Sequence, residues 1–182
     1  MQTLKAHVAP APDVTRPQHA SSARSARLAP EQSLPPQTGC GTIGGMAENL
    51  TETFHTQMPF TVALGVRDAV GTRERVEALV EWDATRCTIG GVLHGGLLIA
   101  LADSVGGYCA YLNLPDGSSG TATIESKTNF LRPVRSGHVR AVARPLHVGR
   151  RIIVVDTELL DEQGRLVART TQTQAVLAGG AG

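Results

Sequence analysis

The feature that most constrains this chain is one apolar stretch, residues 90–112, which reads GGVLHGGLLIALADSVGGYCAYL. Its apolar part, from residue 97 onward, is shorter than the roughly 20 residues needed to cross a bilayer, and Asp103 interrupts it. Because residues 97–102 leave almost no polar stripe, a helix here would be apolar on every side and would need other structure around it. We therefore predict a buried central helix wrapped by strands.

Two features of this predicted helix are typical of catalytic sites. The His94-Gly95-Gly96 turn at its start leaves backbone N–H groups without helical partners, and the helix dipole adds partial positive charge there. Such a turn can stabilise a developing oxyanion. Asp103 is the only formally charged side chain between His94 and Asp116. A carboxylate on a buried helix is costly unless it is hydrogen-bonded or used in chemistry.

The spacing of these two features predicts an oligomer. Gly95 and Asp103 are eight positions apart, which is roughly 12 Å along a helix axis at about 1.5 Å per residue. One copy cannot bring both groups to a single atom. Two helices packed antiparallel across a two-fold axis can bring Asp103 of one copy to the Gly95 N–H of the other. We therefore expect at least a homodimer with two equivalent sites.

Composition and charge narrow the functional class. The 182 residues suffice for one domain with a tail. A formal net charge of +1 gives no reason to expect nucleic acid or a membrane as partner. The cysteines Cys40, Cys87 and Cys109 lack metal-ligand spacing, and their odd number argues against a disulfide framework. We expect a cytoplasmic protein without a bound metal.

Residues 1–46 differ in composition from the rest of the chain. They are rich in Ala, Pro, Ser and Gln and have no apolar periodicity, so we expect a disordered extension before a domain at residues 47–179. The arginines of this segment faintly resemble a transit peptide, but no apolar signal-peptide core is present. A further hypothesis is that translation begins at Met46, which directly precedes the first sequence of globular character. The mass of the native chain tests it.

The segments before the central helix are predicted as one short helix and two strands. Residues 48–58 carry apolar residues at four-residue spacing, which favours a helix that Pro59 ends. The next elements are a strand, a turn, an alternating half-buried strand and a loop, placed at residues 60–67, 68–72, 75–82 and 83–91.

Four strands are predicted after the helix. They are separated by turns rich in Gly, Pro and Asp and cover residues 121–131, 138–148, 151–161 and 165–177. Because no second helix interrupts them, we expect them to pair in chain order as an antiparallel meander. The predicted fold class is α+β, with one curved antiparallel sheet around one long central helix.

The ordered combination of three motifs resembles a known family. The motifs are His-Gly-Gly with an acid nine positions after the His, NFLRP at residues 129–133 and HVGRR at residues 147–151. Together they resemble the hotdog-fold thioesterases, and within them the PaaI-type and 4-hydroxybenzoyl-CoA thioesterase branch. The resemblance covers about residues 50–178. It implies the hotdog fold, hydrolysis of an acyl-CoA thioester to a free acid and CoA without a cofactor, and homodimers that pair into homotetramers.

The resemblance also implies roles for single residues. Asp103 matches the family's catalytic carboxylate, acting as general base on water or as nucleophile. Gly95 matches the backbone donor that polarises the thioester carbonyl, and Thr123 matches a position near the attacking water. Six residues before His94, where relatives commonly carry Asn or Gln, this chain has Thr88, whose hydroxyl is shorter than an amide. This departure implies an altered pose, a lower rate or a role taken over by another residue.

The remaining candidates concern substrate binding. We expect His94 to orient the glycine turn rather than to act as a base. Contacts to substrate are expected from Gly96, Asn129, Arg132, Arg150 and Arg151. Each of the three arginines taken alone is expected to be a solvated surface charge, but at least one of them is expected to bind the phosphates of CoA.

The acyl pocket stays open at this stage. Its candidate lining is the set Val105, Tyr108, Cys109 and Tyr111 on the central helix, or residues of the short N-terminal helix. An aryl group and a medium-length chain suit these residues equally.

Other reaction schemes lack their motifs. There is no Gly-x-Ser-x-Gly elbow, no metal-ligand spacing and no phosphate-binding or dinucleotide loop. Hotdog-fold dehydratases pair an Asp with a His on one element, whereas no His follows Asp103 until His138. The alternative that stays open is a non-catalytic acyl-CoA-binding or ligand-sensing module, which Thr88 favours and Asp103 opposes.

Overall fold

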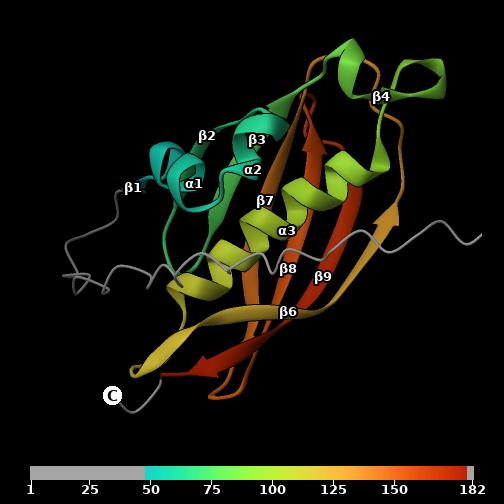
Figure 1. Cartoon of the computed structure of the whole chain (residues 1–182). Helices are drawn as coiled ribbons and strands as arrows, with labels where there is room; N and C mark the ends of the chain where they lie inside the picture. Colours follow the sequence, from blue (N-terminus) through green and yellow to red (C-terminus); the bar gives the residue numbers. More distant parts are fainter. Residues whose placement is uncertain (1–47, 180–182) are drawn as a thin grey trace, which may run out of the picture. The chain divides into compact units, whose positions relative to one another are not determined.

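The computed structural model describes residues 48–179, in which a curved antiparallel sheet packs on one long helix, α3 (Gly95–Leu112) (Figure 1). This arrangement confirms the predicted α+β architecture. The predicted extension at residues 1–46, the hypothesis about Met46 and the domain boundary at residue 47 lie outside the described residues and stay predictions.

The main sheet has seven strands in the order β1-β2-β3-β7-β8-β9-β6, and every neighbouring pair is antiparallel. Its strands are β1 (Glu48–Asn49), β2 (Val66–Gly71), β3 (Val76–Glu81), β6 (Ser118–Phe130), β7 (His138–Val148), β8 (Ile152–Asp161) and β9 (Leu166–Ala178). Two short strands, β4 (Cys87–Thr88) and β5 (Val92–Leu93), pair separately before α3. The short 3-10 helices η1 (Ala84–Arg86) and η2 (Ile89–Gly91) complete this connection.

The predicted meander is correct for β7, β8 and β9 and wrong for β6. Instead of joining β7, β6 pairs with β9 along its whole length, from Ser118 to Phe130. The edge of β7 that β6 would need is occupied by β3, whose Val76 faces Ala143 and whose Glu81 faces His138. Turn residues indicate where a strand ends, but they do not indicate which strand edge is free, so β6 lies at the far edge of the sheet (Figure 1).

The predicted strand at residues 60–67 is wrong, because residues 60–64 form a helix. The chain first forms α1 (Thr51–Gln57), which confirms the short helix, and then α2 (Phe60–Leu64). Pro59 precedes α2 with φ −56°, and Gly65 ends it in the left-handed region with φ 71°. Proline at the start and glycine after the end are helix signals, and here they outweigh the apolar composition that favoured a strand.

The predicted turn at residues 68–72 is a β-bulge. The strand β2 continues to Gly71, and its register with β3 shifts between Arg67 and Val70. Asp68 lies in this bulge with φ 51°, a conformation that Asp tolerates better than most residues.

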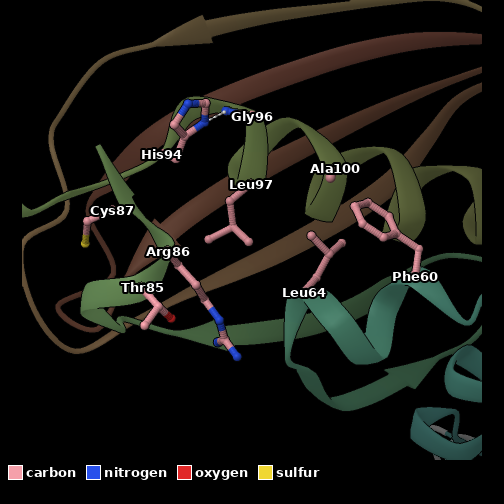
Figure 2. Close-up of a pocket in the computed structure, with 9 residues that line it drawn as sticks. All are labelled: Phe60, Leu64, Thr85, Arg86, Cys87, His94, Gly96, Leu97 and Ala100. Carbon is pink, nitrogen blue, oxygen red and sulfur yellow. Dashed lines mark hydrogen bonds between the residues drawn. The ribbon is translucent and has the colours of Figure 1, made fainter. Parts of the chain in front are cut away.

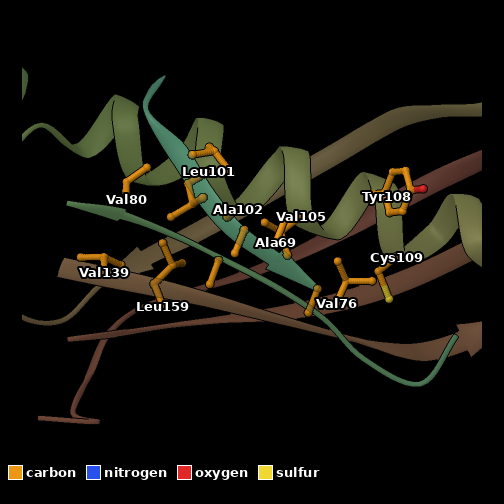
Figure 3. Close-up of a cluster of buried hydrophobic side chains, with 14 of the residues drawn as sticks. Ala69, Val76, Val80, Leu101, Ala102, Val105, Tyr108, Cys109, Val139 and Leu159 are labelled. Carbon is orange, nitrogen blue, oxygen red and sulfur yellow. The ribbon is translucent and has the colours of Figure 1, made fainter. Parts of the chain in front are cut away.

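The hydrophobic core lies between α3 and the concave face of the sheet (Figure 3). The helix contributes fully buried side chains such as Leu101 and Val105, which pack against strand residues that include Val76, Val139 and Leu159. Burial of each such side chain contributes about 1.5–3 kcal/mol to folding. This apolar contact fixes the position of α3 on the sheet.

Three of the helix residues considered for the acyl pocket belong to this core. Val105, Tyr108 and Cys109 are buried in this cluster, where the Tyr108 ring packs on Phe54 of α1 with centroids 4.9 Å apart, so the prediction that they line a pocket is wrong for a single copy. Tyr111 is half-buried, and its ring stacks on Tyr108 with centroids 5.7 Å apart. Burial raises the pKa of the Cys109 thiol to about 12, so the group stays a neutral thiol at physiological pH.

The other side of α3 is not wrapped by the sheet. Ile99 is 39% exposed and Asp103 is half-buried, so the predictions of an enclosed helix and a buried acid are wrong for a single copy. By length and composition alone, α3 is the one helix among residues 48–179 that could span a membrane. Its packing against the sheet is that of a core helix.

Candidate active site

The first turn of α3 is built around His94. His94 is the N-cap residue, and its Nδ1 accepts a hydrogen bond of 2.9 Å from the Gly96 N–H. This contact satisfies one of the donors that a helix start leaves free. His94 therefore contacts the glycine turn as predicted, and the Gly96 N–H is engaged by this hydrogen bond.

The neighbouring Gly95 N–H has no acceptor among residues 48–179. It lies at the positive end of the α3 dipole, where an anionic or partly anionic oxygen is stabilised. A side chain at Gly95 would place its Cβ 3.2 Å from Cζ of Phe130. The absence of a side chain thus lets the Phe130 ring of β6 pack against the start of the helix.

The hairpin formed by β4 and β5 positions this turn. The His94 N–H donates to the Arg86 carbonyl over 3.0 Å, and the Leu93 N–H donates to the Val134 carbonyl over 2.9 Å. Thr88 lies in β4 opposite Val92 and is exposed. Its hydroxyl has no hydrogen-bond partner in the described part of the chain, so the structure gives no contact between Thr88 and the other predicted catalytic residues.

Asp103 meets Thr123 on the side of α3 that faces β6. The Thr123 hydroxyl donates to Asp103 Oδ1 over 3.2 Å, although twenty positions separate the two residues. A shift in the pairing of β6 with β9 between Thr123 and Glu125 accompanies this contact. The structure therefore brings together two of the predicted catalytic residues, with the carboxylate accessible from outside.

Two buried glutamines behind this pair were missed by sequence reasoning. Gln172 and Gln174 on β9 are 0% and 1% exposed, and the amide of Gln174 donates to Thr123 Oγ1 over 2.8 Å. The available signal was the alternation TQTQ within a predicted strand, which places Gln172 and Gln174 on the same face as Thr170. Glutamine is usually exposed, so the pattern was compatible with a solvent-facing strand.

A pocket of about 280 Å³ opens beside the first turn of α3 (Figure 2). One wall is apolar, since Phe60 and Leu64 of α2 face Leu97 and Ala100 of α3. The rest of the lining comes from the loop and the turn before α3, namely Thr85, Arg86, Cys87, His94 and Gly96. The helix α2, which the sequence indicated as a strand, therefore forms part of the candidate site.

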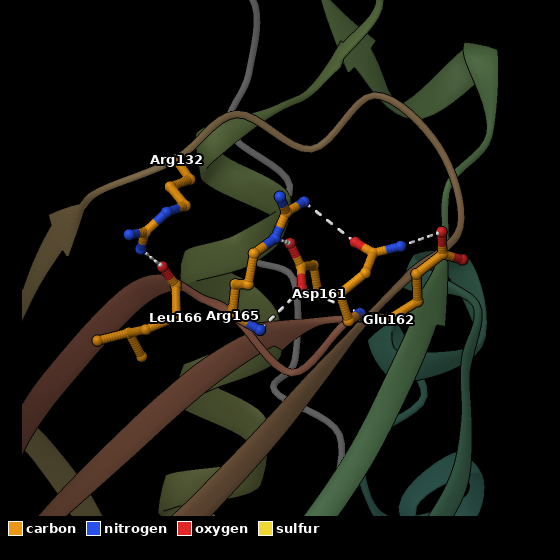
Figure 4. A network of polar contacts seen from close by, with 6 residues as sticks. Arg132, Asp161, Glu162, Arg165 and Leu166 are labelled. Atoms are coloured by element: carbon orange, nitrogen blue, oxygen red, sulfur yellow. Dashed lines mark hydrogen bonds and ion pairs between the residues drawn. The ribbon is translucent and has the colours of Figure 1, made fainter.

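The predicted substrate arginines lie at opposite ends of the sheet. Arg132 donates to the Leu166 carbonyl over 2.6 Å at the start of β9 (Figure 4). Arg150 and Arg151 lie in the turn between β7 and β8, roughly 30 Å away because β8 has ten residues at about 3.3 Å each. A single copy therefore cannot direct all three arginines to one phosphate. Asn129 is exposed near the end of β6, opposite Arg169.

Arg150 and Arg151 border a second cavity. It has a volume of about 520 Å³ and is also lined by Asp116, Ser118 and Val176 near the C-terminal end of α3. Within residues 48–179, no three His, Cys, Asp or Glu side chains are grouped as metal ligands. The expectation that the protein uses no metal and no cofactor stays a prediction.

Comparison with known proteins gives the same family for sequence and fold. The family model described as Thioesterase superfamily matches residues 90–168. The 1,4-dihydroxy-2-naphthoyl-CoA hydrolase of Escherichia coli is 36% identical over 104 residues, which cover 57% of this chain and 76% of that enzyme. The proofreading thioesterase EntH of Cronobacter sakazakii is 38% identical over 87 residues, which cover 48% and 63% of the two chains.

Solved structures extend the likeness to most of the described residues. A thioesterase from Haemophilus influenzae superposes with a TM-score of 0.65 at 30% identity, covering 75% of this chain and 93% of that one. The E. coli PaaI protein superposes with a TM-score of 0.62 at 23% identity, covering 70% and 91%, which shows the shared fold alone. The family match, the related hydrolase and the common architecture establish that this chain belongs to the thioesterase superfamily and is a hotdog-fold thioester hydrolase.

Proposed function

We propose that the protein is an acyl-CoA thioesterase in which Asp103 of one copy and the Gly95 N–H of a second copy act on the same thioester. The observation that carries this proposal is the path of β6 beside α3. Thr123 of β6 contacts Asp103, and Phe130 of β6 contacts Gly95. Both groups therefore lie beside β6, which pairs only with β9 among residues 48–179, at positions that a second copy can reach.

The proposed reaction follows from the chemistry of these two groups. The Gly95 N–H and the helix dipole polarise the thioester carbonyl and stabilise the oxyanion that forms on attack. As general base, Asp103 takes a proton from water while the water oxygen bonds to the carbonyl carbon. The C–S bond then breaks, CoA leaves as a thiolate that takes up the proton, and the acid is released. As nucleophile, Asp103 would instead form a mixed anhydride that water hydrolyses.

The residues midway between the two groups are suited to a dimer interface. The midpoint between Gly95 and Asp103 on α3 is Ile99, a large apolar side chain that is 39% exposed. The midpoint between Thr123 and Phe130 on β6 falls at residues 126–127. An axis there would pair the free edges of two β6 strands antiparallel and would cover Ile99.

Charge on β6 agrees with this axis. If the axis passes at Ser126, Glu125 of one copy lies opposite Lys127 of the other, so each dimer has two complementary pairs. The same register places Thr123 opposite Asn129 of the second copy. Asn129, which is exposed in one copy, would then lie at the shared site.

The pocket beside the first turn of α3 suits the acyl group. It is lined by His94 and Gly96, the two neighbours of Gly95 in the sequence. Its apolar wall of Phe60, Leu64, Leu97 and Ala100 favours an aryl or medium-length apolar acyl group. The related 1,4-dihydroxy-2-naphthoyl-CoA hydrolase is named for a substrate with an aromatic acyl group and CoA, which supports the proposal of an aryl-CoA substrate.

The cavity beside Arg150 and Arg151 suits the phosphates of CoA. Asp103 lies nine positions before Leu112, the last residue of α3, which is roughly 13 Å along the helix at about 1.5 Å per residue. Arg150 and Arg151 lie near this end, so the copy that supplies Asp103 would also supply the phosphate contacts. Arg132 is not part of this proposal, because its guanidinium lies at the other end of the sheet and donates to the Leu166 carbonyl.

Release of free thiol from a panel of CoA thioesters tests the proposal. The panel contains phenylacetyl, hydroxybenzoyl, hydroxynaphthoyl and straight-chain thioesters, and it is assayed with the wild type and with Asp103→Asn. We expect turnover that Asp103→Asn lowers at least about 100-fold, while binding of CoA thioesters measured by calorimetry persists. The control is Asp68→Asn, an exposed acid in the β2 bulge where Asn is also tolerated, which leaves turnover unchanged.

Two outcomes contradict the proposal in different ways. Turnover that survives Asp103→Asn removes Asp103 from the chemistry. Binding of every thioester without turnover in the wild type establishes the ligand-sensing alternative instead.

Assembly and location are proposed at a coarser level. We propose that the dimers pair into tetramers, because exposed apolar side chains remain at Leu146, Val148 and Ile152 outside the α3 face. Light scattering of the purified protein measures the assembly. The free thiols of Cys87 and Cys109 fit a reducing, cytoplasmic location.

A further inference from the structure

Beneath α3, the buried glutamines Gln172 and Gln174 form a polar layer next to the apolar core. A buried amide without partners costs about 1–3 kcal/mol per lost hydrogen bond, so such groups persist where their hydrogen bonds are satisfied. The proposed chemistry uses neither side chain directly. Their contacts show what they hold in place.

The amide of Gln174 has polar neighbours on both its nitrogen and its oxygen side. Its Nε2 donates to Thr123 Oγ1 over 2.8 Å. Beside its Oε1 lies the Thr121 hydroxyl, whose one hydrogen is shared between Gln174 Oε1 at 3.1 Å and the Ala175 carbonyl at 3.0 Å. The second hydrogen on Nε2 points toward Gln172. When the Gln172 amide is oriented with its oxygen on this side, Gln174 Nε2 donates to that oxygen over 2.7 Å. The Gln172 oxygen on this side therefore favours the orientation in which the Gln174 nitrogen faces Thr123.

The orientation of Gln172 follows from its surroundings. With its nitrogen toward the Ala102 carbonyl (3.2 Å), its oxygen accepts from Gln174 Nε2 and from the Gly107 N–H (3.2 Å). The reversed amide would face these two donors with its own N–H groups, and its one gain would be a contact of 3.5 Å to Asp103 Oδ1. The first orientation gives the Gln172 oxygen two donors and its nitrogen one acceptor, so it is the favoured one.

The Thr123 hydroxyl is the link between this layer and the candidate base. A hydroxyl carries one hydrogen, and accepting a bond from Gln174 leaves that hydrogen free to point elsewhere. The acceptor it meets is Asp103 Oδ1 at 3.2 Å. If Gln174 presented an acceptor to Thr123 instead, the hydroxyl hydrogen could turn away from the carboxylate.

We propose that Gln174 is a positioning residue that fixes the Thr123 hydroxyl as a donor to Asp103 and thereby holds the carboxylate in its reactive orientation. The proposal rests on the proposed role of Asp103. Gln174 acts through Thr123 and does not touch the substrate. Because Gln174 is itself held between Gln172 and Thr121, this chain of hydrogen bonds is anchored in β6 and β9.

A double-mutant cycle tests this role. Gln174→Met keeps the length of the side chain and removes both amide groups, and Thr123→Val keeps the shape of threonine and removes the hydroxyl. We expect Gln174→Met to lower kcat about three- to ten-fold with little change in KM, as for the loss of one hydrogen bond in the transition state. In the Thr123→Val background, Gln174→Met should have no further effect on kcat, whereas in Thr123→Ser the loss should reappear.

Matched controls separate positioning from folding. Thr128→Val removes another hydroxyl of β6, whose partner is Thr170 Oγ1 at 2.7 Å, and should leave kcat unchanged. If Gln174→Met does not fold, Thr121→Val removes the hydroxyl that is shared between Gln174 Oε1 and the Ala175 carbonyl. This change should lower kcat about two-fold in a manner that again depends on Thr123.

The outcomes distinguish this inference from the proposed function. An equal loss of kcat in both Thr123 backgrounds, or no loss in either, overturns the role of Gln174. Turnover that survives Asp103→Asn overturns the proposed function itself, whatever Gln174 does.

Discussion

Gly106 of α3 and Gln172 of β9 meet at a point where the helix has no room for a side chain. A Cβ at Gly106 would overlap the Gln172 amide, with Cδ only 2.7 Å and Thr157 Oγ1 3.0 Å away. At the next position, Gly107, a Cβ would lie 4.0 Å from its nearest neighbour, Gln174 Nε2. The missing side chain at Gly106 therefore makes room for the Gln172 amide. A methyl group at Gly107 would make only ordinary van der Waals contact.

This difference predicts opposite effects of alanine at the two positions. Gly106→Ala should lower the free energy of unfolding by about 1–3 kcal/mol, because the new methyl group forces Gln172 or the helix to shift. Gly107→Ala should be neutral or should raise it by up to about 1 kcal/mol, because alanine favours helices over glycine. Urea unfolding followed by circular dichroism measures both changes. Equal destabilisation at the two positions would contradict the packing described above.

The Gly95 N–H can be deleted without disturbing the helix. Gly95 is the first residue of α3, where proline is well accepted, and His94 before it is extended with ψ 132°, as proline requires. Gly95→Pro should lower kcat about 100-fold or more if this N–H stabilises the oxyanion. Gly95→Ala keeps the N–H and makes the same Cβ contact with Phe130, so it should retain most activity. Similar losses in both variants would assign the effect to crowding at Phe130.

A site shared between copies predicts that inactive variants complement each other. In a heterodimer of Asp103→Asn with Gly95→Pro, one site carries both changes and the other carries neither. After co-refolding of equal amounts, half of the dimers are mixed and each has one intact site, so activity should reach about a quarter of the wild-type level. The measurement is the thiol-release assay before and after mixing. A mixture that stays inactive would mean that each site lies within one copy.

The Asp161 carboxylate predicts a loss of stability in acid. Burial opposes its ionisation, but hydrogen bonds from the Arg165 N–H and guanidinium and from the Gln163 N–H outweigh this and hold its pKa below the ordinary 3.8 (Figure 4). A pKa lowered by folding stabilises the folded state above pH 3.8, and this contribution disappears as pH falls through the lower folded-state pKa.

The corresponding variant is Asp161→Asn. It should melt at a lower temperature than the wild type at pH 7, and the difference should shrink below pH 3.8 as Asp161 in the wild type becomes protonated. Thermal melts from pH 7 to pH 2.5 measure it. Asp116→Asn, at an exposed acid in the loop after α3, is the control. A difference that stays constant with pH would show that the charge of Asp161 is not its cause.

Local patterns in the sequence predicted the elements of the fold well. The apolar run predicted α3, and alternation bounded by turn residues predicted β3, β7, β8 and β9 within one or two residues. These signals succeed because periodicity records which face of an element is buried. The segment at residues 60–64 was assigned wrongly, because five residues are too few to show a period and only Pro59 and Gly65 marked the helix.

The candidate site was predictable in part. His94, Gly95, Asp103 and Thr123 were all selected from the sequence, and the structure places Thr123 beside Asp103. Their catalytic roles stay predictions. The buried glutamines of β9 were not found, because the sequence does not show that a polar side chain lies beneath a helix with two adjacent glycines.

What the sequence by itself determined is therefore the identity and order of the elements and the groups at the start and middle of α3. Only the tertiary structure decided that β6 lies beside β9, that Asp103 is open on one side, and that Gln174 lies behind Thr123. The physical reason is the distance along the chain over which each interaction acts. Helix and strand periodicity arise between residues a few positions apart, whereas strand order and the hydrogen bonds of a buried amide depend on which edges and cavities remain once the whole chain has packed.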